Sequence, residues 1–257
     1  MLSAERHQLI ANAVNQAGMI STKELIQHLG VSAETVRRDL TMMEERGLLT
    51  RVRGGAAAAG TLRGFAPEEA PYAERSSGGQ TAKRVVAEIA AALLKPGMTI
   101  VIDVGTTAVH LAAAVPQDFQ GLVATPSLLV AGELSSRPNM EVLVAGGRVR
   151  GGDQVCGGVQ TVEFFASLNA DISFIGSGGV DARAGVTDFY REEIAVKRQM
   201  MRHSQRQYIL CDASKFGLIA PHQVCSLDEP TGLITDVAPD GELATALGSK
   251  GIEILHG

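Results

Sequence analysis

Hydroxyl and glycine residues follow an apolar, strand-like segment in the middle of the chain. After Ile100-Val-Ile102 the sequence continues as Asp103-Val-Gly105-Thr106-Thr107 and then takes on a helical pattern. A glycine lets a ligand approach the backbone closely, and the first N–H groups of a helix have no partner within the helix. With two hydroxyl groups beside them, they form a site that suits a phosphate. The segment therefore predicts an anion site, and an ordinary capped turn is the alternative.

Polar or glycine-rich turns also end several other predicted strands. Ligands of an open α/β sheet bind beyond the carboxyl ends of its strands, so these turns predict one shared pocket for a small, phosphorylated, hydroxyl-rich molecule. Lys197 or Lys215 would supply a cation, and Asp181, Asp188 or Glu193 would accept ligand hydroxyls. The alternative for each charged residue is a solvated helix face or a structural ion pair. The full candidate set is Asp103, Gly105, Thr106, Thr107, Thr125, Ser127, Gly146, Gly147, Gly176, Gly179, Asp181, Asp188, Glu193, Lys197, Asp212 and Lys215.

A second set of candidate residues lies near the N-terminus. Ser21 and Glu24 form a capping-box pattern for a short helix that ends at Gly30, and Ser32 can cap the next helix, which ends at Gly47. Two helices joined by a tight turn, the second bearing two arginines on its polar face, are typical of a DNA-binding helix-turn-helix. The segment 48–52 and its return strand predict a wing. The candidate DNA-binding residues are Ser32, Glu34, Thr35, Arg37, Arg38, Thr41, Arg51, Arg53 and Gly54. The alternative is a small helical domain whose arginines are only solvated.

Length and periodicity place these two sets in separate domains. A chain of 257 residues usually forms two domains, and one large α/β domain is the alternative. We expect a helical head over residues 1–57, a linker rich in Ala, Pro, Ser and Gly over 58–79, and a domain with a mostly parallel sheet over 80–257. The predicted strands are 98–102, 122–125, 141–145, 171–175, 207–211 and 233–235, and predicted helices include 80–94, 107–115 and 191–201.

Charge and cysteine content narrow the function classes. The net charge of −5 divides into +1 for residues 1–60 and −6 for the rest, so the head would contact DNA through locally placed arginines rather than a broad basic field. The three cysteines have no CxxC spacing, the first residues carry no apolar leader, and no apolar run of about 18 residues occurs. The six histidines are scattered. We therefore expect a cytoplasmic protein without a membrane span, a metal site or a cofactor.

Several of these segments resemble one family. The run Val31-Ser-Ala-Glu-Thr-Val-Arg-Arg-Asp-Leu40, with Glu44-Glu45-Arg-Gly-Leu-Leu and Arg51-Val-Arg-Gly-Gly-Ala56, resembles the winged helix-turn-helix of DeoR-family bacterial regulators. Asp103-Val-Gly-Thr-Thr, Val144-Ala-Gly-Gly, Gly185-Val-Thr and Asp212-Ala-Ser-Lys-Phe-Gly are similar to the sensor domain of that family. The resemblance implies a sensor domain that resembles ribose-5-phosphate isomerase in fold and binds phosphorylated sugars or polyols. Asp188-Phe189 with Glu193 and Lys197 is most similar to the glycerol-3-phosphate-responsive branch.

The sequence departs from the family pattern at three places. Arg53 stands where wings of the family often have His, and Pro126 stands where Thr-Asn-Ser is common. Proline removes a side-chain amide and a backbone donor, so the effector contact of the family at this position is not expected here. The segment Gly176-Ser-Gly-Gly179 lacks the acidic residue of the usual Gly-Ala-Asp-Gly.

The resemblance predicts a regulator that represses a carbohydrate or polyol catabolic operon under control of a phosphorylated effector. An isomerase-like sugar-phosphate enzyme and a nucleic-acid scaffold are the alternatives. Isomerases of this fold carry Asp-Gly-Ala-Asp-Glu where this chain has Ile175-Gly-Ser-Gly-Gly179, so we expect binding without turnover. The expected partners are double-stranded operator DNA, the effector and further copies of the chain in a dimer or tetramer, since one head offers few phosphate contacts.

Overall fold

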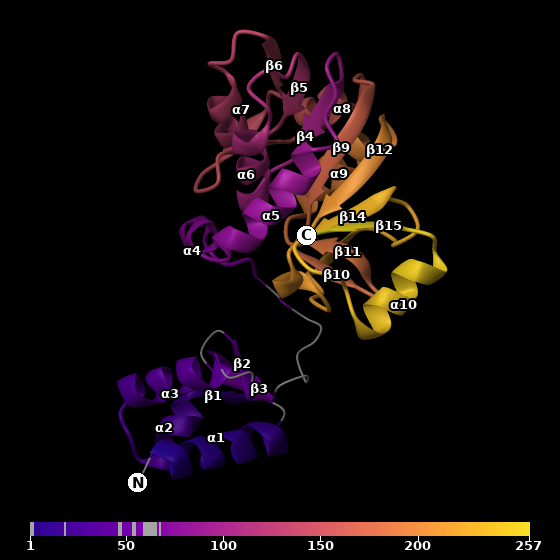
Figure 1. Cartoon of the computed structure of the whole chain (residues 1–257). Helices are drawn as coiled ribbons and strands as arrows, with labels where there is room; N and C mark the ends of the chain where they lie inside the picture. The colour runs from indigo at the N-terminus through magenta and orange to yellow at the C-terminus, as the bar shows by residue number, and fades with distance from the viewer. Residues whose placement is uncertain (1–2, 18, 46–47, 53–54, 59–65, 67) are drawn as a thin grey trace. The chain divides into compact units, whose positions relative to one another are not determined.

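The computed structural model describes residues 3–17, 19–45, 48–52, 55–58, 66 and 68–257 (Figure 1). Contacts divide the chain into a first unit, Met1–Phe65, and a second unit, Ala66–Gly257. Each unit has a hydrophobic core of its own. In the described part of the chain, no helix is long and apolar enough to cross a membrane.

The first unit consists of three helices and a small antiparallel sheet. Ser21 accepts a hydrogen bond from the Glu24 N–H while the Glu24 side chain accepts one from the Ser21 N–H, and Gly30 ends that helix in a left-handed conformation with φ +64°. Ile10, Leu25 and Leu40 are buried between the helices. The elements are α1 (Ser3–Ala17), β1 (Met19–Ser21), α2 (Thr22–Leu29), α3 (Ala33–Glu45), β2 (Leu49–Val52) and β3 (Gly55–Ala58), with strand order β1-β3-β2. The helices α2 and α3 and the β2–β3 wing agree with the prediction, and β1 is an additional strand.

The second unit is built on a seven-stranded parallel sheet with strand order β15-β14-β12-β9-β4-β5-β6. Its strands are β4 (Thr99–Ile102), β5 (Gly121–Thr125), β6 (Met140–Val144), β9 (Ala170–Gly176), β12 (Ser204–Leu210), β14 (Gly232–Thr235) and β15 (Glu253–His256). Its helices are α4 (Tyr72–Ser77), α5 (Gln80–Ala91), α6 (Thr106–Ala114), α7 (Leu128–Leu134), α8 (Val159–Ala166), α9 (Arg191–Arg202) and α10 (Gly241–Ser249), with a 3-10 turn η1 (Ala213–Lys215). The predicted α/β class and its six predicted strands are confirmed, and β15 is an additional edge strand.

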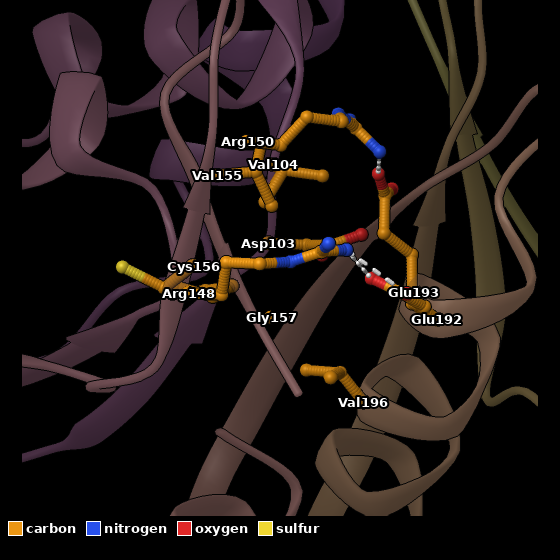
Figure 2. Close-up of a pocket in the computed structure, with 11 residues that line it drawn as sticks. Asp103, Val104, Arg148, Arg150, Val155, Cys156, Gly157, Glu192, Glu193 and Val196 are labelled. Carbon is orange, nitrogen blue, oxygen red and sulfur yellow. Dashed lines mark hydrogen bonds and ion pairs between the residues drawn. The ribbon is translucent and has the colours of Figure 1, made fainter. Parts of the chain in front are cut away.

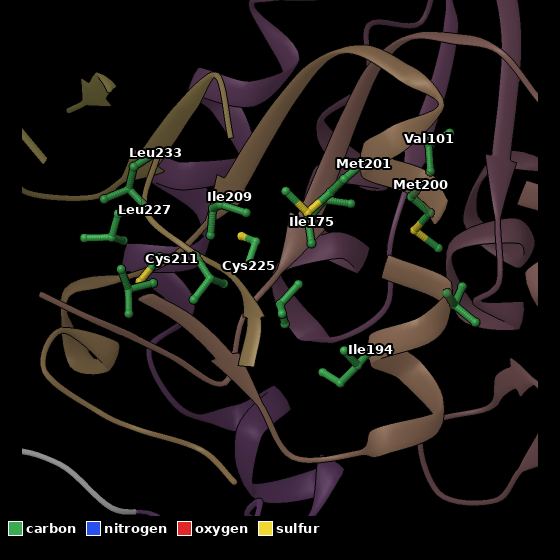
Figure 3. Packing of buried hydrophobic residues seen from close by; sticks show 14 of the residues in the cluster. Val101, Ile175, Ile194, Met200, Met201, Ile209, Cys211, Cys225, Leu227 and Leu233 are labelled. Carbon is green, nitrogen blue, oxygen red and sulfur yellow. The ribbon is translucent and has the colours of Figure 1, made fainter. Parts of the chain in front are cut away.

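Successive residues of the strands enter opposite faces of this sheet, as the period of two requires. Val101 and Ile175 belong to the core under α8, α9 and α10, which Figure 3 shows from close by. Ile100, Ile102 and Phe174 belong to the core under α5, α6 and α7. The molecule therefore buries both faces, which explains why the strand segments are almost continuously apolar.

Short antiparallel strands complete the unit near the carboxyl ends of the sheet. These strands are β7 (Arg148–Arg150) paired with β8 (Val155–Gly157), and β10 (Gly179–Asp181), β11 (Gly185–Asp188) and β13 (His222–Cys225) in a three-stranded sheet. They were not predicted, because each is only three or four residues long and contains glycine or polar residues in place of the apolar run that marks the buried strands. Such short segments show too few alternations to form a recognisable pattern.

The second half of the predicted linker belongs to the second unit. The Ala66 N–H donates a hydrogen bond of 2.9 Å to the Ile219 carbonyl, and Tyr72–Ser77 forms α4. Lys83 donates to the carbonyl oxygens of Arg75 and Gly78. The linker predicted over 58–79 is therefore wrong from residue 66 onward, because tertiary contacts fix a segment whose composition is typical of an extended connection.

Candidate functional site

The outward face of α3 carries the predicted DNA-reading residues. Arg37 is 64% exposed and lies 3.8 Å from Glu34, and Arg38 is also exposed. Ser32 accepts a hydrogen bond of 3.2 Å from the Thr35 N–H at the start of the helix, as predicted. The Thr41 hydroxyl donates to the Arg37 carbonyl. The buried side of the same helix holds Val36, Leu40 and Met43.

A buried carboxylate fixes α3 against α1, and no local sequence pattern predicts this contact. Asp39 is 3% exposed, accepts hydrogen bonds from Arg6, and lies 3.1 Å from the His7 ring. The Arg6 guanidinium holds the pKa of the Asp39 carboxyl below its usual range, against the effect of burial. This pairing orients the helix that carries Arg37 and Arg38.

The wing residues are described only in part. Arg51 lies in β2, where its backbone is opposite Ala56 of β3. Arg53 and Gly54 lie outside the described residues. The predicted contacts of these three residues with DNA stay predictions.

A pocket of about 440 Å³ lies at the carboxyl ends of the central strands. The chain forms β4, proceeds outward to β5 and β6, and returns to β9 on the other side of β4. The loops after β4 and β9 therefore diverge, which is where ligands bind in sheets of this kind. The predicted residues that line this pocket are Gly105, Thr106, Thr107, Gly176, Asp188, Glu193, Lys197 and Lys215.

One wall of the pocket is the start of α6. Gly105 precedes the helix with φ +102° and provides no capping side chain, and Thr106 and Thr107 are the first two helical residues. The first N–H groups of a helix need partners from outside it, and they carry partial positive charge. The turn that the sequence singled out therefore presents an uncapped helix N-terminus to the pocket.

Lys197 is not the free cation that the sequence suggested. It is 1% exposed, forms ion pairs with Asp103 and Asp188, the latter at 3.0 Å, and donates to the Gly176 carbonyl. The Asp103 carboxylate also accepts a hydrogen bond of 2.9 Å from the Gly176 N–H. Burial alone would lower the pKa of Lys197, but Asp103, Asp188 and Glu193 together raise it above its usual range. Lys197 thus joins β4, β9, β11 and α9 as a structural ion cluster at the pocket floor.

Residues that the sequence did not single out complete the pocket. They are Glu69, Arg75, Arg150, Asp153 and Ser177, together with the apolar Val104 and Leu210. Arg150 of β7 pairs with Glu193 at 2.5 Å, donates to Asp153, and lies over the Tyr190 ring at 3.6 Å. The Arg150–Glu193 pair joins segments that are 43 positions apart, so no local pattern could have revealed it.

Figure 2 shows an adjoining pocket that shares Val104, Arg150 and Glu193 with the first. Asp103 lines this second pocket, and Arg148 closes one side by donating to Glu192 at 2.7 Å. Burial raises the pKa of Glu193 to about 7, with Lys197 and Arg150 opposing that rise and Asp188 and Asp103 adding to it.

The remaining predicted residues line neither pocket and have structural contacts instead. Ser127 accepts from the Val130 N–H as the cap of α7, and Thr125 accepts from the Ser127 N–H. Asp181 accepts from the Arg183 and Ala184 N–H groups, and Asp212 accepts from the Ser214 N–H, so both stabilise turns. The residues in this group are Thr125, Ser127, Gly146, Gly147, Gly179, Asp181 and Asp212.

Two of the three glycines of that group serve close packing, and the third accepts a hydrogen bond. The Gly146 carbonyl accepts a hydrogen bond of 2.6 Å from Thr161. Gly147 has φ +136°, and a Cβ there would lie 2.5 Å from the Gly157 carbonyl oxygen. A Cβ on Gly179 would lie 2.2 Å from the Leu218 carbonyl oxygen. Backbone contacts, rather than an approaching ligand, require glycine at the last two positions. No group of three His, Cys, Asp or Glu residues that could hold a metal ion occurs among the residues that the structure describes.

Comparisons with known proteins agree with this division of the chain. The family model "DeoR-like helix-turn-helix domain" matches residues 6–61, and "DeoR C terminal sensor domain" matches residues 79–237. The glycerol-3-phosphate regulon repressor of Escherichia coli K12 is 29% identical over 254 residues, 99% of each chain. The transcriptional regulator GlpR of Haloferax volcanii is 32% identical over 257 residues, 100% of this chain and 99% of that protein.

Among solved structures, ribose 5-phosphate isomerase A from Methanocaldococcus jannaschii aligns with a TM-score of 0.40 and 15% identity, over 53% of this chain and 54% of that chain. The sequence matches extend through both units and include the α3 face and most of the sensor sheet. The protein therefore belongs to the DeoR family of DNA-binding transcriptional regulators.

Proposed function

We propose that this protein represses an operon for the catabolism of a carbohydrate or polyol, and that a phosphorylated sugar or polyol in the β4–β9 pocket controls its affinity for operator DNA. One observation carries the proposal: the uncapped N-terminus of α6 lines a pocket that also holds cations and carboxylates. Two relatives support the same class of effector. One is named glycerol-3-phosphate regulon repressor, and the name of the other assigns it to the aga operon.

The phosphate end of such a molecule suits the α6 side of the pocket. Backbone N–H groups and the hydroxyls of Thr106 and Thr107 can donate to phosphate oxygens, and Arg75 and Lys215 line the same space. A free sugar or polyol cannot form these charge-assisted hydrogen bonds. We therefore expect the unphosphorylated compound to bind much more weakly.

The hydroxyl end suits the carboxylate side. Asp188 and Glu193 line the pocket as acceptors for ligand hydroxyl groups. A phosphorylated compound of three to six carbons carries a phosphate at one end and hydroxyl groups along its chain, which matches these two sides of the pocket.

An isomerase is the second candidate function, because Glu193 has a pKa of about 7, the range of a general base. Against it, Glu193 is paired with Arg150, and Asp188 with Lys197. The turn 176–179 that follows β9 contains no carboxylate. We propose that the protein binds its effector without converting it.

A calorimetric titration of the full chain tests the effector class. The panel is glycerol 3-phosphate, fructose 1-phosphate, ribose 5-phosphate and unphosphorylated glycerol, and each phosphorylated sample is checked afterwards for conversion by phosphorus NMR. We expect binding of at least one phosphorylated compound, none of glycerol, and no new signal. Thr106→Ala should weaken that binding, whereas Thr245→Ala in α10 should not. Binding of none of these phosphates would contradict the proposal, and a new signal would favour the isomerase.

We further propose that the chain acts as a dimer or tetramer. One head of net charge +1 offers few phosphate contacts, and two linked heads on repeated half-sites raise the effective concentration of the second head. An operator can be selected from a library of random duplexes, and we expect it to contain repeated half-sites. Light scattering that finds only monomers at micromolar concentration, with and without that operator, would contradict this proposal.

A further inference from the structure

The segment that leads from the first unit into the second supplies two charged residues to the pocket. Ala66 is hydrogen-bonded to Ile219, and Glu69 and Arg75 follow it closely and both line the pocket. The boundary between the units lies between Phe65 and Ala66. Glu69 is thus a pocket residue only a few positions from the covalent connection to the DNA-binding unit.

Arg75 is held in place by contacts within this segment and by one contact outside it. Its guanidinium lies 3.1 Å from Glu69 and 3.9 Å from Asp153, and its Nε donates to the Ala70 carbonyl at 2.9 Å. It also lies over the ring of Tyr72, 5.6 Å from the centroid. The side chain is 17% exposed and lies at the pocket wall, where two carboxylates already pair with its charge.

Glu69 lies among other carboxylates, so an additional anion that enters beside it meets electrostatic repulsion. Its side chain is 12% exposed, and burial raises the pKa of its carboxyl, while Arg75 lowers it and Asp188 raises it. Lys215 and Lys197 lower it further. Asp153, Asp188 and Glu193 line the same pocket. A phosphate that entered beside α6 would add two negative charges to a space that Glu69 shares.

We propose that Glu69 holds Arg75 in the absence of effector, and that the phosphate of the effector replaces Glu69 as the partner of Arg75. Arg75 then becomes a ligand-binding residue, and Glu69 is displaced together with the start of the segment 68–79. This inference rests on the proposed function, and it adds the route by which occupancy reaches the DNA-binding unit. An effector shifts a conformational equilibrium only through contacts that differ between the two states. Arg75 contacts Glu69 in the free state and phosphate in the bound state, so this contact differs between the two states.

The variant Glu69→Gln tests the exchange, because it keeps the shape of the side chain and removes the competing charge. We expect it to bind the phosphorylated panel compounds and inorganic phosphate about tenfold more tightly than the wild type, as a like charge in a partly buried site would imply. We also expect the panel compounds to alter its operator affinity less than that of the wild type. Arg75→Ala should weaken the binding of both kinds of probe.

The matched control is Glu74→Gln, which makes the same charge change at an exposed position of α4 that does not line the pocket. Its affinity for every probe should stay within about twofold of the wild type, a difference below about 0.5 kcal/mol. Hydrogen exchange of the wild type provides a measurement that needs no variant. Amides in 68–79 should exchange faster when the tightest-binding panel compound is present.

The outcomes separate this inference from the proposed function. If the wild type binds no phosphorylated probe, the proposed function fails and this inference fails with it. If the wild type binds a phosphorylated compound, but Glu69→Gln binds it equally well and exchange in 68–79 does not change, only the displacement of Glu69 is overturned. Tighter binding by Glu69→Gln with an unchanged Glu74→Gln control supports it.

Discussion

The two units hold the charged residues of their candidate sites in opposite ways. Arg37 and Arg38 of the first unit lie exposed on one helix, and Glu34, which lies 3.8 Å from Arg37, is itself 85% exposed. In the second unit the guanidinium or ammonium groups that line the pocket already have acceptors. Arg75 has Glu69 and Asp153, Arg150 has Asp153 and Glu193, Lys197 has Asp103 and Asp188, and Lys215 donates to the Ser177 carbonyl.

The proposed functions of the two surfaces account for this difference. DNA is a long polyanion, and exposed cations release its counterions without first breaking a strong internal contact. A small ligand needs a pocket that keeps its shape when empty, and buried ion pairs supply that shape at a cost in desolvation. A ligand that enters such a pocket must compete with partners already present, so its binding rearranges them.

Of the four tests of this comparison, Lys197→Ala should have the largest effect on stability. Removal of one partner from a buried ion cluster leaves Asp103 and Asp188 without their cation, so we expect a loss of about 3 to 5 kcal/mol in the free energy of unfolding of the second unit. Urea denaturation followed by circular dichroism measures it. The control Lys250→Ala removes an exposed lysine 3.4 Å from Asp228 and should cost less than about 1 kcal/mol. Equal losses in the two variants would show that Lys197 is not the structural centre of the pocket.

Arg38→Ala tests the exposed side of the comparison. If the arginine contacts a guanine edge, its removal should cost about 1 to 3 kcal/mol of operator affinity, with no change in the unfolding of either unit. Fluorescence anisotropy with the selected operator provides the measurement, and Arg37→Ala is expected to behave alike. The control Arg84→Ala removes an exposed arginine of α5 and should leave operator affinity unchanged. Unaltered affinity in both α3 variants, with intact circular dichroism, would remove these residues from the DNA interface.

Glu193→Gln should change how the stability of the second unit depends on pH. The folded-state pKa of about 7 lies above the ordinary value for glutamate, so the wild type loses unfolding free energy as the pH rises from about 5 to 8. Glu193 faces Lys197, Asp188, Arg150 and Asp103, and the loss is on the order of 2 kcal/mol. Urea denaturation at several pH values should show a flatter profile for Glu193→Gln than for Glu192→Gln, its exposed neighbour. Parallel profiles for both variants would mean that Glu193 ionises freely.

Ser21→Ala should produce the smallest effect, and only in the first unit. It removes the acceptor for the Glu24 N–H and one half of the capping box, which costs about 1 kcal/mol. Thermal unfolding detects this change, and Ser21→Thr should recover most of the loss because it keeps a hydroxyl. The expectation fails if the alanine variant unfolds at the temperature of the wild type.

Much of the fold could be predicted because its signals are local. The capping box at Ser21 and Glu24, the left-handed Gly30 and the period of α3 are determined by residues within a few positions of one another. The apolar strand segments predicted the parallel sheet for the same reason, and the turn Gly105-Thr106-Thr107 predicted an uncapped helix start at the pocket. The sequence by itself thus determined the main helices, six strands of the parallel sheet, the fold class and one wall of the candidate site.

Only the tertiary structure decided which charged residues meet. Lys197 of α9 and Asp103, which follows β4, are 94 positions apart and come together because α9 packs against the sheet where β4 and β9 are neighbours. Asp212 and Ser127, which a linear inspection places at equivalent strand ends, stabilise turns instead. Glu69 and Arg75 reach the pocket because the segment after residue 66 packs against the second unit. Ion pairing between distant segments depends on how far apart they lie in space, and positions along the chain do not determine those distances.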